Sequence, residues 1–180
     1  INMTAGAIAE CTATIHARAE SAVSKQTASY VSADPFTWDT VSLQVGGSAN
    51  GEFESATVTI TNPIVGVPTL NGAKTEGKLK RDGFRTVTVN GDQDFSNQTQ
   101  SNIFKAQTRQ RFLFTLTGGD IGGSKNNQLT IDMPQTNYTT FTFPIGGAGR
   151  ITASYEGNGE YDTSSSYSVR FTLQNTQASY

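Results

Sequence analysis

The segments of the sequence most suggestive of chemistry are rich in glycine, because a glycine loop that precedes a helix can cradle a phosphate group. The segment GGAGR occupies residues 146–150, and a second glycine cluster lies near residue 120. A P-loop also requires a lysine followed by serine or threonine, but here Ser124 and Lys125 come in the reverse order. Both segments also lie between expected strands. We therefore predict no cofactor and interpret the first segment as a bend containing Gly146, Gly147 and Gly149.

Oxygen donors at alternate positions could begin a calcium loop, and Asn90, Asp92 and Asp94 have this spacing. Such a loop also needs a glycine at its sixth position and a glutamate at its twelfth. This chain has Phe95 and Ser101 there. We interpret the stretch as a solvated turn and predict no metal site.

Catalytic side chains are few. The only histidine, His16, follows the only cysteine, Cys11, at a spacing that fits no standard zinc site. The alternation around Cys11 favours a small buried hydrophobe over a reactive thiol. Glu156, Glu160 and Asp162 form a carboxylate cluster of the kind used in glycoside hydrolysis, but the chain has a single tryptophan to serve as a sugar platform. We predict no catalytic residues and expect that the protein is not an enzyme.

Composition narrows the function classes further. The chain has 180 residues, with 13 Lys and Arg against 15 Asp and Glu, a net charge of −2. This balance gives no global attraction to nucleic acid or to an anionic membrane. No apolar run approaches the roughly 20 residues that span a bilayer, and no signal peptide is visible. With one cysteine, no disulfide can form within the chain.

Strict alternation of apolar and polar residues dominates the elements that must hold these side chains. In ATVTITN (residues 56–62) and GFRTVTVNGD (83–92), valine or isoleucine alternates with threonine. In RQRFLFTLT (109–117), Phe112, Phe114 and Leu116 fall on one face. Eight or nine such strands, joined by short polar or glycine-bearing connections, predict an all-β fold, an antiparallel β-sandwich or barrel.

One segment lacks this alternation and predicts a single short helix. In SNQTQSNIFKAQTR (residues 96–109), polar residues precede Ile103 and Phe104, and Ser96 or Asn97 is suited to cap the start. Such a helix would lie against the sheet through Ile103 and Phe104. A plain loop is the alternative.

The first 39 residues differ from the remainder, because they are rich in Ala, Ser and Thr and contain few large apolar side chains before Phe36 and Trp38. Residues 11–19 alternate like a strand with a small-residue apolar face. We expect residues 1–39 to form an extended N-terminal arm with a strand, and residues 40–180 to form the β-sandwich domain.

The ordered set of strands between Leu43 and Asn175 resembles the tail tube (major tail) proteins of bacteriophages with long non-contractile tails. The resemblance rests on GFRTVTV, then the short helix around NIFKA, then FLFTLTGG, LTIDMPQTNY and the terminal SYSVRFTLQN. It implies a β-sandwich with a flanking helix and an extended arm. It also implies a structural virion protein that forms hexameric rings, which stack into a tube through which the genome is ejected.

The resemblance further implies partners and a location. The subunit would associate with copies of itself and with tape measure, terminator and baseplate proteins, and DNA would pass through the lumen without specific binding. Assembly would take place in the cytoplasm of a bacterial host, and the product would be the virion tail. No membrane partner is expected.

Two groups of residues are the candidate contacts between subunits or rings. The segment from Ile64 to Gly83 is too long for a simple turn and carries Lys74, Lys78, Lys80 and Arg81. The glycine bend with Gly146, Gly147 and Gly149 is the second group. The alternative functions are another virion β-module (a decoration, tail terminator or receptor-binding protein) or a carbohydrate-binding adhesin that uses Trp38.

Overall fold

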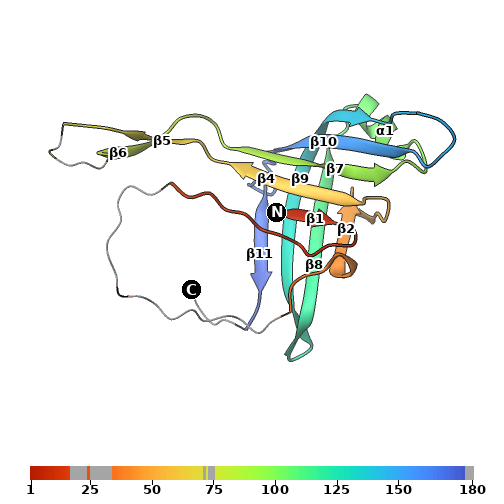
Figure 1. Ribbon diagram of the computed structural model, residues 1–180, viewed down its shortest axis with the longest axis horizontal. Coiled ribbons are helices and arrows are strands. Elements are labelled where there is room, and N and C mark those ends of the chain that lie inside the picture. The colour runs from red at the N-terminus through yellow and green to blue at the C-terminus, as the bar shows by residue number, and fades with distance from the viewer. Residues whose placement is uncertain (17–23, 25–33, 71, 73–75, 177–180) are drawn as a thin grey trace.

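The structure is a computed structural model that describes residues 1–16, 24, 34–70, 72 and 76–176. Within these residues the chain forms eleven strands, one α-helix and one 3-10 helix (Figure 1). In chain order they are β1 (Asn2–Thr4), η1 (Trp38–Thr40), β2 (Val41–Val45), β3 (Ser48–Ala49), β4 (Ser55–Thr61), β5 (Ile64–Val67), β6 (Lys78–Arg81), β7 (Thr86–Asp94), α1 (Thr99–Lys105), β8 (Gln110–Gly122), β9 (Lys125–Thr142), β10 (Thr152–Glu160) and β11 (Arg170–Gln174).

Nine of these strands form one antiparallel sheet, which confirms the predicted fold class. Its order is β1-β4-β7-β10-β9-β8-β2-β3, and β11 pairs with β9 outside this path. Strands β5 and β6 form a separate two-stranded sheet. The structure has more strands than expected because alternation cannot identify pieces as short as β1 and β3.

The long strand β9 holds the two halves of the sheet together. Its N-terminal part, through Asp132, pairs with β11, and its C-terminal part, from Gln135, pairs with β10. Pro134 lies between the two pairings, and the β8–β9 register also shifts opposite it. Proline cannot donate a ladder hydrogen bond, so its place is at such an interruption. In Figure 1, β4, β7 and β10 cross over β8 and β9, and the core cluster contains side chains from both groups of strands.

Side chains from both groups of strands meet in one core. The predicted face of β8 is buried, with Phe112, Phe114 and Leu116 each at most 1% exposed. Phe53 and Tyr138 pack edge-on against Phe112, with ring centroids 5.9 and 5.8 Å away. Burial of the Phe112, Phe114 and Tyr138 rings, with Phe53 partly buried against them, contributes favourably to folding.

The predicted helix is present as α1 and lies on the C-terminal half of β9. Ile103 and Phe104 pack against the core as expected, and the Phe104 ring stacks on Phe141 with centroids 6.2 Å apart. The helix begins one or two residues later than predicted, because Gln98 is the N-cap in place of Ser96 or Asn97. Asn97 nevertheless accepts a hydrogen bond from the Thr99 N–H at 2.8 Å.

The strand expected at residues 11–19 is a wrong prediction over the part that the structure describes. Residues 11–16 have no regular secondary structure and are exposed, and Cys11 is exposed rather than buried. Residues 17–19 lie outside the described residues. Small alanine and cysteine side chains bury too little apolar area to hold a strand against the sheet.

The stretch Asn90–Asp94 is also a correction, because it belongs to β7 and is not a turn. It pairs on one side with β10, and on the other side Asn90 pairs with Thr57 of β4 while Asp92 and Asp94 bond to the backbone of residues 52–54. Gly91 is required there by a close approach, since a Cβ on it would overlap the carbonyl oxygen of Ser55. Asn-Gly-Asp is a common turn signal, but here the glycine accommodates a neighbouring strand.

Candidate assembly surfaces

Strands β5 and β6 form a hairpin that projects from the end of the sheet (Figure 1), where a loop was expected. Ile64 pairs with Arg81, Val65 with Lys80 and Val67 with Lys78. Its apolar side chains are half-exposed, and Leu70, beyond β5, is fully exposed. Lys78, Lys80 and Arg81 are exposed, and Lys74 lies outside the described residues.

The hairpin lies outside the nine-stranded sheet and pairs with none of its strands. Its sheet contains only β5 and β6, and an isolated two-stranded hairpin is marginally stable in water. One contact reaches it from the N-terminal segment, where His16 Nε2 lies 2.8 Å from Glu76 Oε2. A hairpin with exposed leucine, isoleucine and valine beside three cations has the composition of a contact surface.

The second predicted group lies in the connection between β9 and β10. Gly146, Gly147 and Gly149 are exposed, and Gly147 has a φ of 148°, which confirms the expected glycine bend. Arg150 donates to both carboxylate oxygens of Glu54, at 2.5 and 3.1 Å. The arginine in GGAGR is therefore paired with a carboxylate of the same chain.

The structure does not bring the two predicted groups together. The hairpin joins the start of β7, which begins at Thr86, whereas the glycine bend precedes Thr152, the partner of Asp94 at the end of β7. The two groups therefore lie at opposite ends of β7, and Figure 1 shows them at opposite ends of the long axis.

A polar surface that sequence reasoning did not locate covers the outside of β2, β8, β9 and β11. The register aligns Ser42 with Thr115, Thr115 with Thr130 and Thr130 with Thr172 across the four strands. The alternation of apolar and polar residues in the sequence distinguishes the polar side of β8 from its buried side. Only the strand order shows that the polar sides of all four strands form one continuous face, which we call the threonine face.

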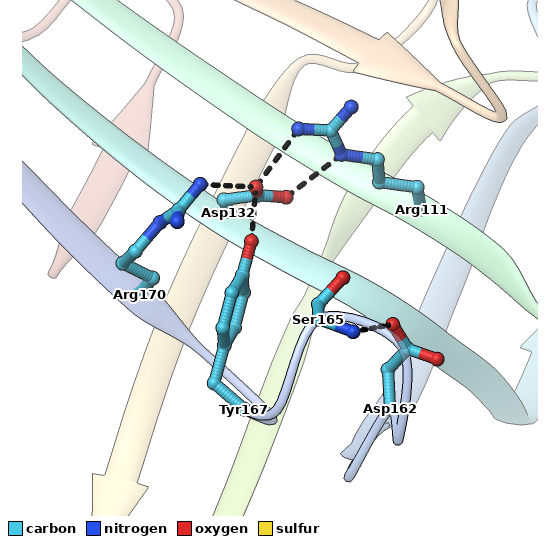
Figure 2. A network of polar contacts seen from close by, with 6 residues as sticks. All are labelled: Arg111, Asp132, Asp162, Ser165, Tyr167 and Arg170. Carbon is cyan, nitrogen blue, oxygen red and sulfur yellow. Dashed lines mark hydrogen bonds and ion pairs between the residues drawn. The ribbon is translucent and has the colours of Figure 1, made fainter.

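A buried carboxylate anchors the C-terminal strand at the margin of this face, as Figure 2 shows. Arg111 donates two hydrogen bonds of 2.8 Å to Asp132. Tyr167 Oη donates to the same carboxylate at 2.8 Å, and Arg170 Nη2 lies 3.5 Å away. The Asp132 side chain is only 4% exposed. Three residues, from β8, from β11 and from the turn before β11, thus converge on one carboxylate of β9.

The electrostatics of this network follow from its geometry. The bidentate hydrogen bond from Arg111 lowers the pKa of Asp132 below its ordinary value of 3.8, helped by Tyr167 and Arg170 and opposed by burial. The same hydrogen bond raises the pKa of Arg111. In the turn before Tyr167, hydrogen bonds from Ser165 lower the pKa of Asp162. The network is a structural anchor.

Within the carboxylate cluster that the sequence predicted, Glu160 and Asp162 have structural partners. Glu160 pairs with Arg109, and the Ser165 N–H donates to Asp162 at 2.7 Å. Among the described residues, no group of three or more His, Cys, Asp or Glu side chains is placed to hold a metal ion. No helix in the described part of the chain has the length and apolar character to cross a membrane.

The described chain is an antiparallel β-sandwich with a projecting hairpin. Its strand β11 pairs only with β9 among the described strands. These features define a structural module suited to self-assembly. The chain belongs to the phage tail tube protein family, whose model matches residues 1–125. The match includes the N-terminal segment, which the resemblance between Leu43 and Asn175 did not cover. The protein is thus a structural virion protein, a subunit of a tail tube.

One solved structure shares the fold at low sequence identity. The tube-terminating cap of an anti-feeding prophage has a TM-score of 0.55 and 10% identity, over 83% of this chain and 97% of that chain. A chain from the virion of a gene transfer agent particle has a TM-score of 0.48 and 13% identity, over 74% of this chain and 96% of that chain. None of the curated proteins compared matches the sequence.

Proposed function

We propose that six copies of this chain form a ring, and that the rings stack into a tube through which the genome leaves the particle. The ring closes when sheets of neighbouring subunits join edge to edge. Strand β11 supports this, because among the described strands it pairs only with β9. Its other edge can pair with a neighbouring subunit, and edge strands of proteins are normally paired, covered or blunted.

The threonine face carries the proposal, since it supplies a surface suited to a water-filled lumen. Its aligned positions are uncharged Ser42, Thr115, Thr130 and Thr172. At its margin two guanidinium groups share the carboxylate of Asp132, which leaves a small positive excess and no dense basic patch. DNA affinity rises with the number of phosphates a surface neutralises, so this face would let DNA pass without holding it.

The two projecting groups are the proposed contacts within and between rings. Lys74, Lys78, Lys80 and Arg81 belong to one group, and Gly146, Gly147 and Gly149 to the other. Their positions at opposite ends of β7 support head-to-tail stacking, in which each ring presents different surfaces above and below.

The proposal also covers the arm and domain boundaries, the partner proteins and the place of assembly. Residues 1–39 act as an assembly arm and residues 40–180 as the domain, although β1 of the arm pairs with β4. The tube joins tape measure, terminator and baseplate proteins, assembles in the cytoplasm of a bacterial host, and has no enzymatic activity.

Negative-stain microscopy of the purified chain over a range of concentrations tests this function. We expect hollow rings that stack into tubes, with sixfold symmetry in end-on class averages. Single rings that never stack would instead favour a tail terminator. Monomers at every concentration, with the N-terminal segment intact, would refute the proposal.

A further inference from the structure

A pocket of about 410 Å³ opens between the two ends of the nine-stranded sheet. Its walls come from β1 on one side and β2 on the other, and its floor includes Met3, Leu43 and Phe114. These three side chains are at least 92% buried, so the pocket reaches the core. Trp38, which is 53% exposed, stands at its mouth.

The charged residues that line this pocket are acidic. Asp39 and Glu54 line it, and its lining includes no lysine, arginine or histidine. Glu54 is paired with Arg150, whereas Asp39 is exposed and has no hydrogen bond or ion pair among the described residues. The pocket thus offers an apolar interior and one acidic group available for a partner.

The β5–β6 hairpin has the complementary chemistry. Leu70 is fully exposed near its end, and Lys78 and Lys80 follow on β6. Lys78 lies opposite Val67, three residues before Leu70, a span of about 10 Å for an extended chain. An apolar side chain and nearby cations therefore project together from the body.

We propose that the hairpin of one subunit docks on this pocket of another copy, with Leu70 entering the apolar interior and Lys78 or Lys80 meeting Asp39. The pocket strands β1 and β2 lie in the body, away from the hairpin of the same chain (Figure 1). The contact joins two different surfaces of identical chains, so it propagates into a ring or a stack. This inference rests on the proposed tube and identifies the hairpin's partner in it.

A disulfide trap in assembled tubes tests the contact. In a Cys11→Ser background, which removes the only native cysteine, Leu70→Cys is combined with Ala5→Cys on the pocket wall. Because a disulfide requires Cα atoms within about 7 Å, we expect oxidation to convert most of the protein into a covalent ladder on a denaturing gel. The matched control, Leu70→Cys with Asn102→Cys on exposed α1, should remain monomeric.

A charge exchange gives a second readout that needs no cysteine. Asp39→Lys alone, and Lys78→Glu with Lys80→Glu, should each abolish tubes at concentrations where the original chain assembles, while circular dichroism stays unchanged. Combining all three substitutions should restore tubes. Normal tubes with no ladder, a control pair that cross-links instead, or no rescue would overturn the docking contact and leave the tube intact. Failure of the unmodified chain to form tubes would contradict the proposed function itself.

Discussion

Asp132 is the residue through which the C-terminal strand is fixed to the body. Its carboxylate accepts hydrogen bonds from Arg111 and Tyr167 and lies beside Arg170. Removing such a partner leaves cations and a phenol without the acceptor that their positions require. The sequence contains these residues without any local motif to connect them, since they come together only through the pairing of β8, β9 and β11.

The Asp132 network predicts a loss of stability in acid. Because the folded pKa lies below the ordinary 3.8, this contribution is fully present above about pH 4 and is lost as pH falls through the folded pKa. Asp132→Asn should lower the free energy of unfolding by about 2–3 kcal/mol at pH 7. Urea titrations of the unassembled chain between pH 2 and 7 would measure both effects. The Asn variant should depend less on pH than the original; parallel curves would contradict the assignment.

Truncation of the buried β8 face predicts a larger loss at neutral pH. Phe112→Ala or Phe114→Ala should reduce the free energy of unfolding by about 3–5 kcal/mol, because each ring is at least 99% buried. Thr115→Ala on the opposite face is the matched control and should change it by less than about 0.5 kcal/mol. Equal losses in all three variants would mean that the faces of β8 are reversed.

At the level of elements, the sequence predicts well wherever a local pattern coincides with a tertiary contact. The alternation in β4, β7 and β8 and the break at α1 are such cases, because the apolar side chains that define them are the ones packed in or against the core. The glycine bend was also predictable, since its flanking strands left it no helix. At Gly91 and Pro134, by contrast, the local residues suggest a turn or an interruption, and only neighbouring strands decide their roles.

The segments of the candidate assembly surfaces are recognisable in the sequence, but their shapes are not. Length and lysine content identified residues 64–83, yet their pairing as a hairpin depends on a register that short apolar runs do not specify. The threonine face and the acidic pocket combine strands far apart in sequence. No single segment contains enough of either surface to reveal it.

The N-terminal arm predicts a separation between folding and assembly. Met3 is 5% exposed and Ile1 donates its terminal amine to Val58 at 2.7 Å, so residues 1–10 support the body. Deleting residues 12–33 should abolish tube formation and leave the melting temperature of the unassembled chain within a few degrees. Microscopy and calorimetry on one preparation would measure both. A normal tube yield would refute the role of the arm, and deleting residues 1–10 instead should unfold the body.

For the whole molecule, the proposed lumen predicts how an added cation changes DNA retention. One new lysine per subunit should increase retention when it lies on the threonine face and not when it lies on the other group of strands. Thr172→Lys, on the threonine face, should make assembled tubes retain short double-stranded DNA at low salt, with retention falling steeply as salt rises. Thr59→Lys on β4 is the control, an exposed threonine in the other layer. Filter binding across a salt series would measure the difference. Stronger retention by the control would place the lumen on the other face.

The continuity of β9 has a mechanical consequence. A tail tube must keep its shape under mechanical load, so the two groups of strands in each subunit must resist sliding past each other. In most sandwiches that resistance comes from side-chain packing and from loops. Here one strand of 18 residues pairs with β11 through its N-terminal part and with β10 through its C-terminal part, and the change falls at Pro134. A force that slides one group of strands past the other therefore acts on the covalent backbone of β9 as well as on hydrogen bonds. The subunit should resist such shear better than a sandwich whose two sheets share no strand.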